Sequence, residues 1–277
     1  MSKTRILQIT IVVVIVIITV IIYRLPISKP SGEITKEKPE NNKNALQSFD
    51  EKLAALKKSI NPQQLETINA YEKKLASEQA VLQFYDSIAF EWDKLNQPSV
   101  SAHYFEEKAL KDNNENSYIN AAYRYFDAFK LAEDSANRTL MVEKAIKCYE
   151  KVLEINPKNL DAKTDLGICY AEGTNAPMKG ILMLREVVQE KPDHENAQLN
   201  LGFLSVKSNQ YDKALQRFDK VLELNPTRLE VYIYKAQTFL EMGDTTKARQ
   251  NIATYIALIK DEKLKENAEN FLKSLQN

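Results

Sequence analysis

Residues 149–157 read YEKVLEINP, and the same phrase returns as FDKVLELNP at residues 218–226. A third version, LREVVQEKP, lies between them at residues 184–192. The copies end in prolines that are 35 and 34 residues apart, and repetition at this period indicates a stack of similar units. One unit cannot bury its apolar face alone, so we expect the phrase to serve packing, with its proline ending a helix.

Small residues recur with the same period, at places where two helices must approach closely. One series is Gly167, Gly202 and Ala236, and the other is Ala145, Gly180, Ala214 and Ala248. Asn209 and, one unit later, the pair Gly243-Asp244 indicate the end of one helix and the start of the next. Each unit is therefore predicted to be a helical hairpin.

This pattern resembles the tetratricopeptide repeat family, whose hairpins of about 34 residues carry small residues in both helices, then an aromatic residue, then a proline. The matching residues are Gly202, Ala214, Phe218 and Pro226 in one copy, Ala145, Tyr149 and Pro157 before it, then Gly167, Gly180 and Pro192, and finally Ala236 and Ala248. The resemblance covers residues 118–260, and the last copy departs from it at Ile252 and Lys260. It implies an all-α solenoid that winds as a right-handed superhelix.

The chain as a whole has few glycines and prolines, six and nine in 277 residues, which favours helices over a turn-rich β fold. We expect five segments. They are a tail with a transmembrane anchor (1–25), a flexible tether (26–44), N-terminal helices with a degenerate repeat (45–115), the repeats (116–260) and a C-terminal capping helix (261–277).

The anchor is predicted from residues 6–23, ILQITIVVVIVIITVIIY, which as a helix would span roughly 27 Å, close to the thickness of a bilayer core. A cleaved signal peptide is the alternative, but no small-x-small cleavage site follows. We expect a single-pass anchor with a short basic cytoplasmic tail. The rest of the chain would then be extracytoplasmic, which means the periplasm if the organism is a Gram-negative bacterium.

Two amphipathic helices are expected between residues 45 and 95. The first carries Leu46, Phe49, Leu53, Leu56 and Ile60, and a second, longer one runs from Leu65 to Trp92, before Pro98. Their apolar stripes predict packing against the downstream hairpins, and the alternative is the seam of a homodimer.

The sequence contains no recognisable catalytic, cofactor or metal-binding motif, so we interpret the chain as a non-enzyme without a cofactor. The alternative is an enzyme whose site has no recognisable motif. Lys plus Arg and Asp plus Glu both number 38, which leaves no net field to attract nucleic acid. His103 with Glu106 and Glu107 is interpreted as a solvated helix face rather than a cation site. Cys148 and Cys169 are interpreted as small buried side chains, and the alternative is a disulfide between neighbouring helices.

The family resemblance implies a concave groove, lined by the first helix of each hairpin, that receives a peptide or helix. The residues at those places are Thr164, Ile168, Ala171, Leu199, Phe203, Val206, Ile233, Gln237 and Leu240. The lysine and asparagine of carboxylate-clamping members are absent there. The alternative is that these side chains pack between helices. The predicted function is that of a membrane scaffold for protein partners, of the kind that serve envelope assembly, cytochrome c maturation or chaperone networks.

Overall fold

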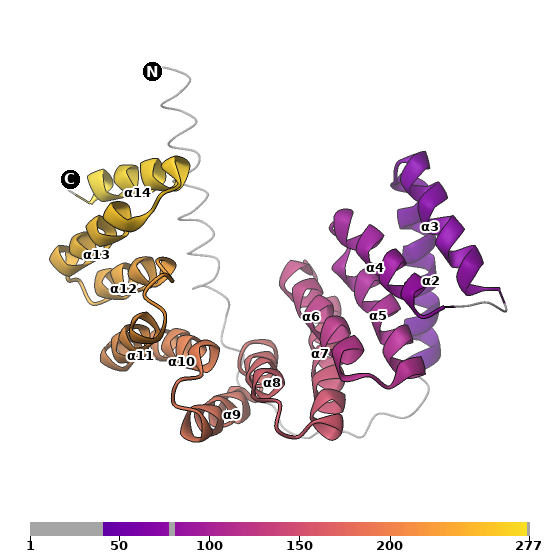
Figure 1. Cartoon of the computed structure of the whole chain (residues 1–277), viewed down its shortest axis with the longest axis horizontal. Helices are drawn as coiled ribbons and strands as arrows, with labels where there is room; N and C mark the ends of the chain where they lie inside the picture. Colours follow the sequence, from indigo (N-terminus) through magenta and orange to yellow (C-terminus); the bar gives the residue numbers. More distant parts are fainter. Residues whose placement is uncertain (1–40, 78–80, 276–277) are drawn as a thin grey trace, which may run out of the picture. The chain divides into compact units, whose positions relative to one another are not determined.

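The computed structural model describes residues 41–77 and 81–275. These residues form thirteen α-helices and no strand (Figure 1). The helices are α2 (Asn41–Ser59), α3 (Pro62–Leu75), α4 (Gln83–Lys94), α5 (Pro98–Asp112), α6 (Glu115–Leu131), α7 (Ser135–Ile155), α8 (Leu160–Gly173), α9 (Pro177–Glu190), α10 (Glu195–Lys207), α11 (Tyr211–Leu224), α12 (Glu230–Glu241), α13 (Thr245–Leu258) and α14 (Glu262–Ser274).

The predicted anchor at residues 6–23 lies outside the described residues, as does the tether up to residue 40. Residues 41–44, which we assigned to the tether, are helical and begin α2. Among the described helices, none has the length and apolar character that crossing a bilayer would require.

Consecutive helices pack on one another from α3 to α14, and α6–α7, α8–α9, α10–α11 and α12–α13 form the predicted hairpins (Figure 1). The sequence signals for the turns are confirmed. Asn209 and Gly243 have φ angles of 56° and 77°, the left-handed conformation that ends a helix. Asp244 then begins α13, with its side chain accepting a hydrogen bond from the Lys247 amide.

The repeated prolines lie in exposed turns just after α7, α9 and α11. In two repeats an asparagine precedes the proline and ties the end of the hairpin to its beginning. Asn156 Nδ2 donates to Glu115 at 3.1 Å, and Asn225 Nδ2 donates to Glu195 at 3.3 Å. The phrase therefore closes each of these two hairpins as well as ending its second helix.

The core is a succession of apolar clusters rather than one centre. The first joins α3 to α8 and contains Trp92, Phe105, Tyr125 and Tyr149. The next three lie between α8 and α10, between α10 and α12, and between α12 and α14. Cys148 and Cys169 are buried and free, which confirms our interpretation, and burial raises the pKa of the Cys148 thiol to about 12.

The prediction of one helix from Leu65 to Trp92 is wrong in one respect, because the segment forms two helices, α3 and α4. The backbone N–H of Ala76 closes α3, and the Ser77 hydroxyl donates to the Lys74 carbonyl at 2.7 Å, which competes with helix continuation. The break allows Ile68 and Trp92 to enter the same core. Phe49, Leu53 and Leu56 pack against this core, so the chain itself covers the stripe that the homodimer alternative required.

The final helix, α14, packs on α13 through Ala268, Leu272 and Leu275. Two other large apolar residues of this helix, Leu264 and Phe271, are exposed. The helix therefore covers the end of the last cluster with a narrower apolar face than expected.

Glycines set the distance between α8 and α9. A Cβ on Gly180 would lie 2.1 Å from the Gly167 carbonyl oxygen and 2.6 Å from the Ala171 amide nitrogen, so no side chain fits there. A helical Gly→Ala change normally stabilises by about 0.5–1 kcal/mol. Here the clash is with backbone, which cannot move aside without separating the two helices.

We predict that Gly180→Ala lowers the free energy of unfolding by about 1–3 kcal/mol, the usual cost of overpacking. The measurement is the urea midpoint followed by circular dichroism. Gln189→Ala, at an exposed position of the same helix, is the matched control and should be near neutral. Equal or higher stability of Gly180→Ala would contradict the close approach of α8 and α9.

Candidate functional site

The predicted groove residues lie on α8, α10 and α12, but two of them cannot reach a ligand. Thr164 is fully buried, and its hydroxyl donates to the Leu160 carbonyl at 2.8 Å. Leu199 is buried in the cluster between α10 and α12. For these two residues the packing alternative is correct, because their helix faces turn toward the neighbouring helices.

Phe203 is half-buried in an aromatic group. Its ring centroid lies 4.8 Å from that of Tyr234 and 5.5 Å from that of Phe218, both edge-on. Ile168, Val206, Ile233 and Leu240 are also half-buried and pack on the core clusters. Ala171 is half-buried beside Gly180, and Gln237 is the exposed member of the predicted set. The first helices of the hairpins, α8, α10 and α12, therefore expose only parts of side chains that are packed in the core, whereas the side chain of Gln237 is exposed.

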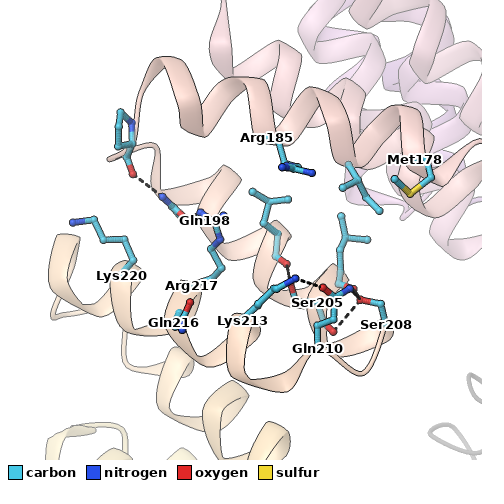
Figure 2. A pocket seen from close by; sticks show the side chains of 14 residues that line it. Met178, Arg185, Gln198, Ser205, Ser208, Gln210, Lys213, Gln216, Arg217 and Lys220 are labelled. Atoms are coloured by element: carbon cyan, nitrogen blue, oxygen red, sulfur yellow. Dashed lines mark hydrogen bonds between the residues drawn. The ribbon is translucent and has the colours of Figure 1, made fainter.

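A second candidate, which sequence reasoning missed, is a pocket of about 680 Å³ between α9, α10 and α11. Figure 2 shows Arg185 from α9, with Lys213, Arg217 and Lys220 from α11, around this pocket. Leu201 and Leu204 of α10 provide an apolar part of its lining. The available sequence signal was the spacing of Lys213, Arg217 and Lys220, which share one face of α11.

A buried amide orients one of these cations. Arg217 Nη1 donates to Gln198 Oε1 at 2.6 Å, and Gln198 Nε2 donates to the Pro192 carbonyl at 2.7 Å (Figure 2). Gln198 is 5% exposed. Burial, and then the positive charge of Arg185, lower the pKa of Arg217. The pocket thus holds like charges close together with one guanidinium fixed in direction.

Polar networks elsewhere tie helices together. The Tyr125 hydroxyl donates to Glu106 at 2.5 Å, and Lys144 binds the same carboxylate at 3.0 Å. The His103 ring lies against that of Phe49, with centroids 4.3 Å apart and the planes tilted by 43°. Burial lowers the pKa of the imidazole, so it is not the solvated residue that we expected. Within the described residues, no three metal-ligating side chains gather.

Asp165 is an unusual carboxyl group of the repeat region. It receives a hydrogen bond of 3.3 Å from the buried Tyr149 hydroxyl, and burial raises the pKa of Asp165 to about 6. Nearby Asp161 raises this pKa further, while Tyr149 and Lys130 lower it. The effect of burial on the pKa of Asp165 therefore outweighs the opposing effects of Tyr149 and Lys130.

Stacked hairpins with small residues at their crossings and clusters between them define the class: an all-α repeat solenoid. Comparison with known proteins identifies the repeat. Tetratricopeptide repeat models match residues 141–159 and residues 205–264. These two stretches are therefore tetratricopeptide repeats, which confirms the resemblance seen in the sequence.

Solved structures share this fold at low sequence identity. TTC0263, a thermophilic TPR protein of Thermus thermophilus, gives a TM-score of 0.51 at 18% identity, over 72% of this chain and 98% of that one. PilW, described as a widely conserved type IV pilus biogenesis factor, gives 0.52 at 18% identity, over 65% and 78%. At this identity the likeness concerns the fold alone.

Curated relatives match over shorter stretches. The RNA polymerase-associated protein CTR9 of Saccharomyces cerevisiae is 34% identical over 80 residues, or 29% of this chain and 7% of that protein. Tetratricopeptide repeat protein 16 of Macaca fascicularis is 25% identical over 153 residues, or 54% and 13%. The chain spans only a small part of the length of these relatives.

We predict that Asp165→Asn stabilises the protein at pH 7 by on the order of 1–2 kcal/mol. Between about pH 4 and 6 the folded state binds a proton that the unfolded state has released, so stability falls as pH rises through this window. Asparagine accepts the Tyr149 hydrogen bond without titrating.

The measurement is the difference in thermal midpoint between Asp165→Asn and wild type from pH 4 to pH 7. The variant's advantage should grow with pH, and the other titrating groups cancel in the difference. An advantage that is constant with pH, or largest at pH 4, would contradict the burial of this charge.

Proposed function

We propose that this protein is a membrane-anchored scaffold that holds protein partners close to a membrane. One observation carries the proposal: stacked tetratricopeptide repeats present half-buried apolar side chains along their first helices. Such surfaces favour an extended peptide or an amphipathic helix of a partner, because each added contact lies one helical hairpin further along.

The groove proposed for this binding is narrower than the sequence indicated. Phe203, Val206, Ile233 and Leu240 offer only the edges that their packing leaves free, and Gln237 offers an exposed amide. A partner would gain apolar contact at the edges and a hydrogen bond at Gln237. Partners from envelope assembly, cytochrome c maturation or chaperone networks remain part of this proposal.

Membrane attachment through residues 6–23 is proposed from their composition. An uncleaved apolar helix of this length would hold the chain permanently, whereas a repeat domain bound only through a partner would dissociate with it. The orientation that we propose places the repeats outside the cytoplasm, with Lys3 and Arg5 inside.

Gln237→Trp tests the groove. The indole would block the surface without removing a packed side chain, so the full chain should lose its partners in capture from native membranes and keep its helical circular dichroism. Gln250→Trp, at an exposed position of α13, is the matched control and should retain them. Equal capture by both variants would show that partners bind elsewhere.

Deletion of residues 6–23 tests the anchor. The full chain should stay in the membrane fraction through washes with high salt and alkaline carbonate, and the deletion variant should appear in the supernatant. A full chain that the carbonate wash releases would refute a spanning anchor.

A further inference from the structure

We infer that the pocket between α9, α10 and α11 is a second docking site, which binds an acidic, leucine-containing peptide segment of a protein partner. Carboxylates of this segment would bind Arg185 and Arg217, and its apolar side chains would contact Ile181 and Leu204. The site is separate from the groove of the first helices, so this inference stands whether or not the groove binds.

The pocket lies on a different side of α10 from the predicted groove. Gln198, Leu201 and Ser205 line it, whereas Phe203 and Val206 pack toward α11 and α12. At about 100° per residue these two sets occupy different faces of one helix. One repeat helix can therefore serve two partners, or two segments of one partner, without competition.

Four cationic side chains line the pocket and, among the described residues, no carboxylate does. Lys220 pairs with Glu223 of its own helix at 3.0 Å. Glu186 of α9 pairs with Lys163 of α8 at 2.9 Å, and Asp219 of α11 pairs with Lys235 of α12 at 2.5 Å. In the part of the chain that the structure describes, no ion pair joins Arg185, Lys213 or Arg217 to a carboxylate. A chain with zero net charge thus concentrates positive charge in one pocket.

Arg217 is organised in advance for a carboxylate. Gln198 holds Nη1 at 2.6 Å and is itself fixed by the Pro192 carbonyl, so the guanidinium keeps its direction before a ligand arrives. Its remaining N–H groups can make charge-assisted hydrogen bonds, which are stronger than neutral ones. A ligand carboxylate would also relieve the repulsion between Arg217 and Arg185.

The size and lining of the pocket favour a peptide over other anions. A volume of about 680 Å³ exceeds the space that an inorganic phosphate fills, and an apolar lining of Ile181, Leu201 and Leu204 would stay uncovered. Met178, which is 59% exposed, extends this apolar surface at the rim. No aromatic side chain is found among the described residues that line it, so nucleic-acid bases would lack a stacking surface.

The experiment measures binding of a fluorescein-labelled peptide, acetyl-Glu-Glu-Leu-Glu-Glu-Leu-Glu-Glu-amide, to the full chain in detergent by fluorescence anisotropy. The same peptide with every Glu replaced by Gln is the ligand control. We expect the acidic peptide to bind, the Gln peptide to bind at least tenfold more weakly, and affinity to fall as salt is raised.

Arg185→Gln with Arg217→Gln should weaken the acidic peptide at least tenfold. Arg249→Gln with Lys263→Gln removes the same charge from exposed positions of α13 and α14, outside the pocket, and should bind like wild type. If the pocket variant fails to fold, Gln216→Glu replaces it. This residue is exposed at the pocket and belongs to none of the apolar clusters, so its new charge should weaken binding severalfold without loss of helix.

Three results would overturn the inference. The first is that the acidic peptide does not bind wild type, and the second is that the two double variants lose binding equally, which would indicate net charge alone. The third is displacement of the peptide by millimolar inorganic phosphate, which would identify a simple anion site. In each case the Gln237→Trp capture result is unaffected, so failure of this site and failure of the groove remain distinguishable.

Discussion

The close approach of two helices at small residues inside each hairpin is the constraint on which the rest of the structure depends. At the crossing of α8 and α9, Gly180 leaves no room for a Cβ atom, and one on Gly167 would lie 3.1 Å from the Gly180 carbonyl oxygen. One hairpin later, the space beside Gly202 is filled instead by the ring of Phe218. Equivalent positions of successive repeats therefore make a backbone contact in one hairpin and an aromatic contact in the next. The type of contact determines how the next helix packs against its neighbours.

Local chemistry made most of the repeat region predictable. Asn209 and Gly243 mark turns because left-handed backbone ends a helix in that way, and Ala214 and Ala248 mark crossings because larger residues do not fit. The break between α3 and α4 was not predictable from periodicity. The break results from the hydrogen bond that the Ser77 hydroxyl makes to the backbone and from the burial of Trp92 in the core. Neither interaction leaves a periodic pattern in the sequence.

The candidate sites were less predictable, for a different reason. A repeat pattern tells which residues face inward within one hairpin, but exposure of Thr164 or Leu199 depends on how the next hairpin lies across it. The pocket depends in addition on where acidic side chains find partners. Glu186 and Asp219 reach lysines on other helices, and this pairing leaves Arg185 and Arg217 beside the same pocket without a carboxylate.

The division of the core into successive clusters has a consequence for motion. The three clusters that follow the first each join only neighbouring helices. From α8 onward the chain can therefore open locally, one hairpin at a time, starting at the C-terminal end, where the last cluster has a neighbour on one side only. Amide protons of α14 should then exchange with solvent sooner than those of α10. A ligand held between α9 and α11 would fasten two hairpins together, and it would turn two independently opening units into one cooperative segment.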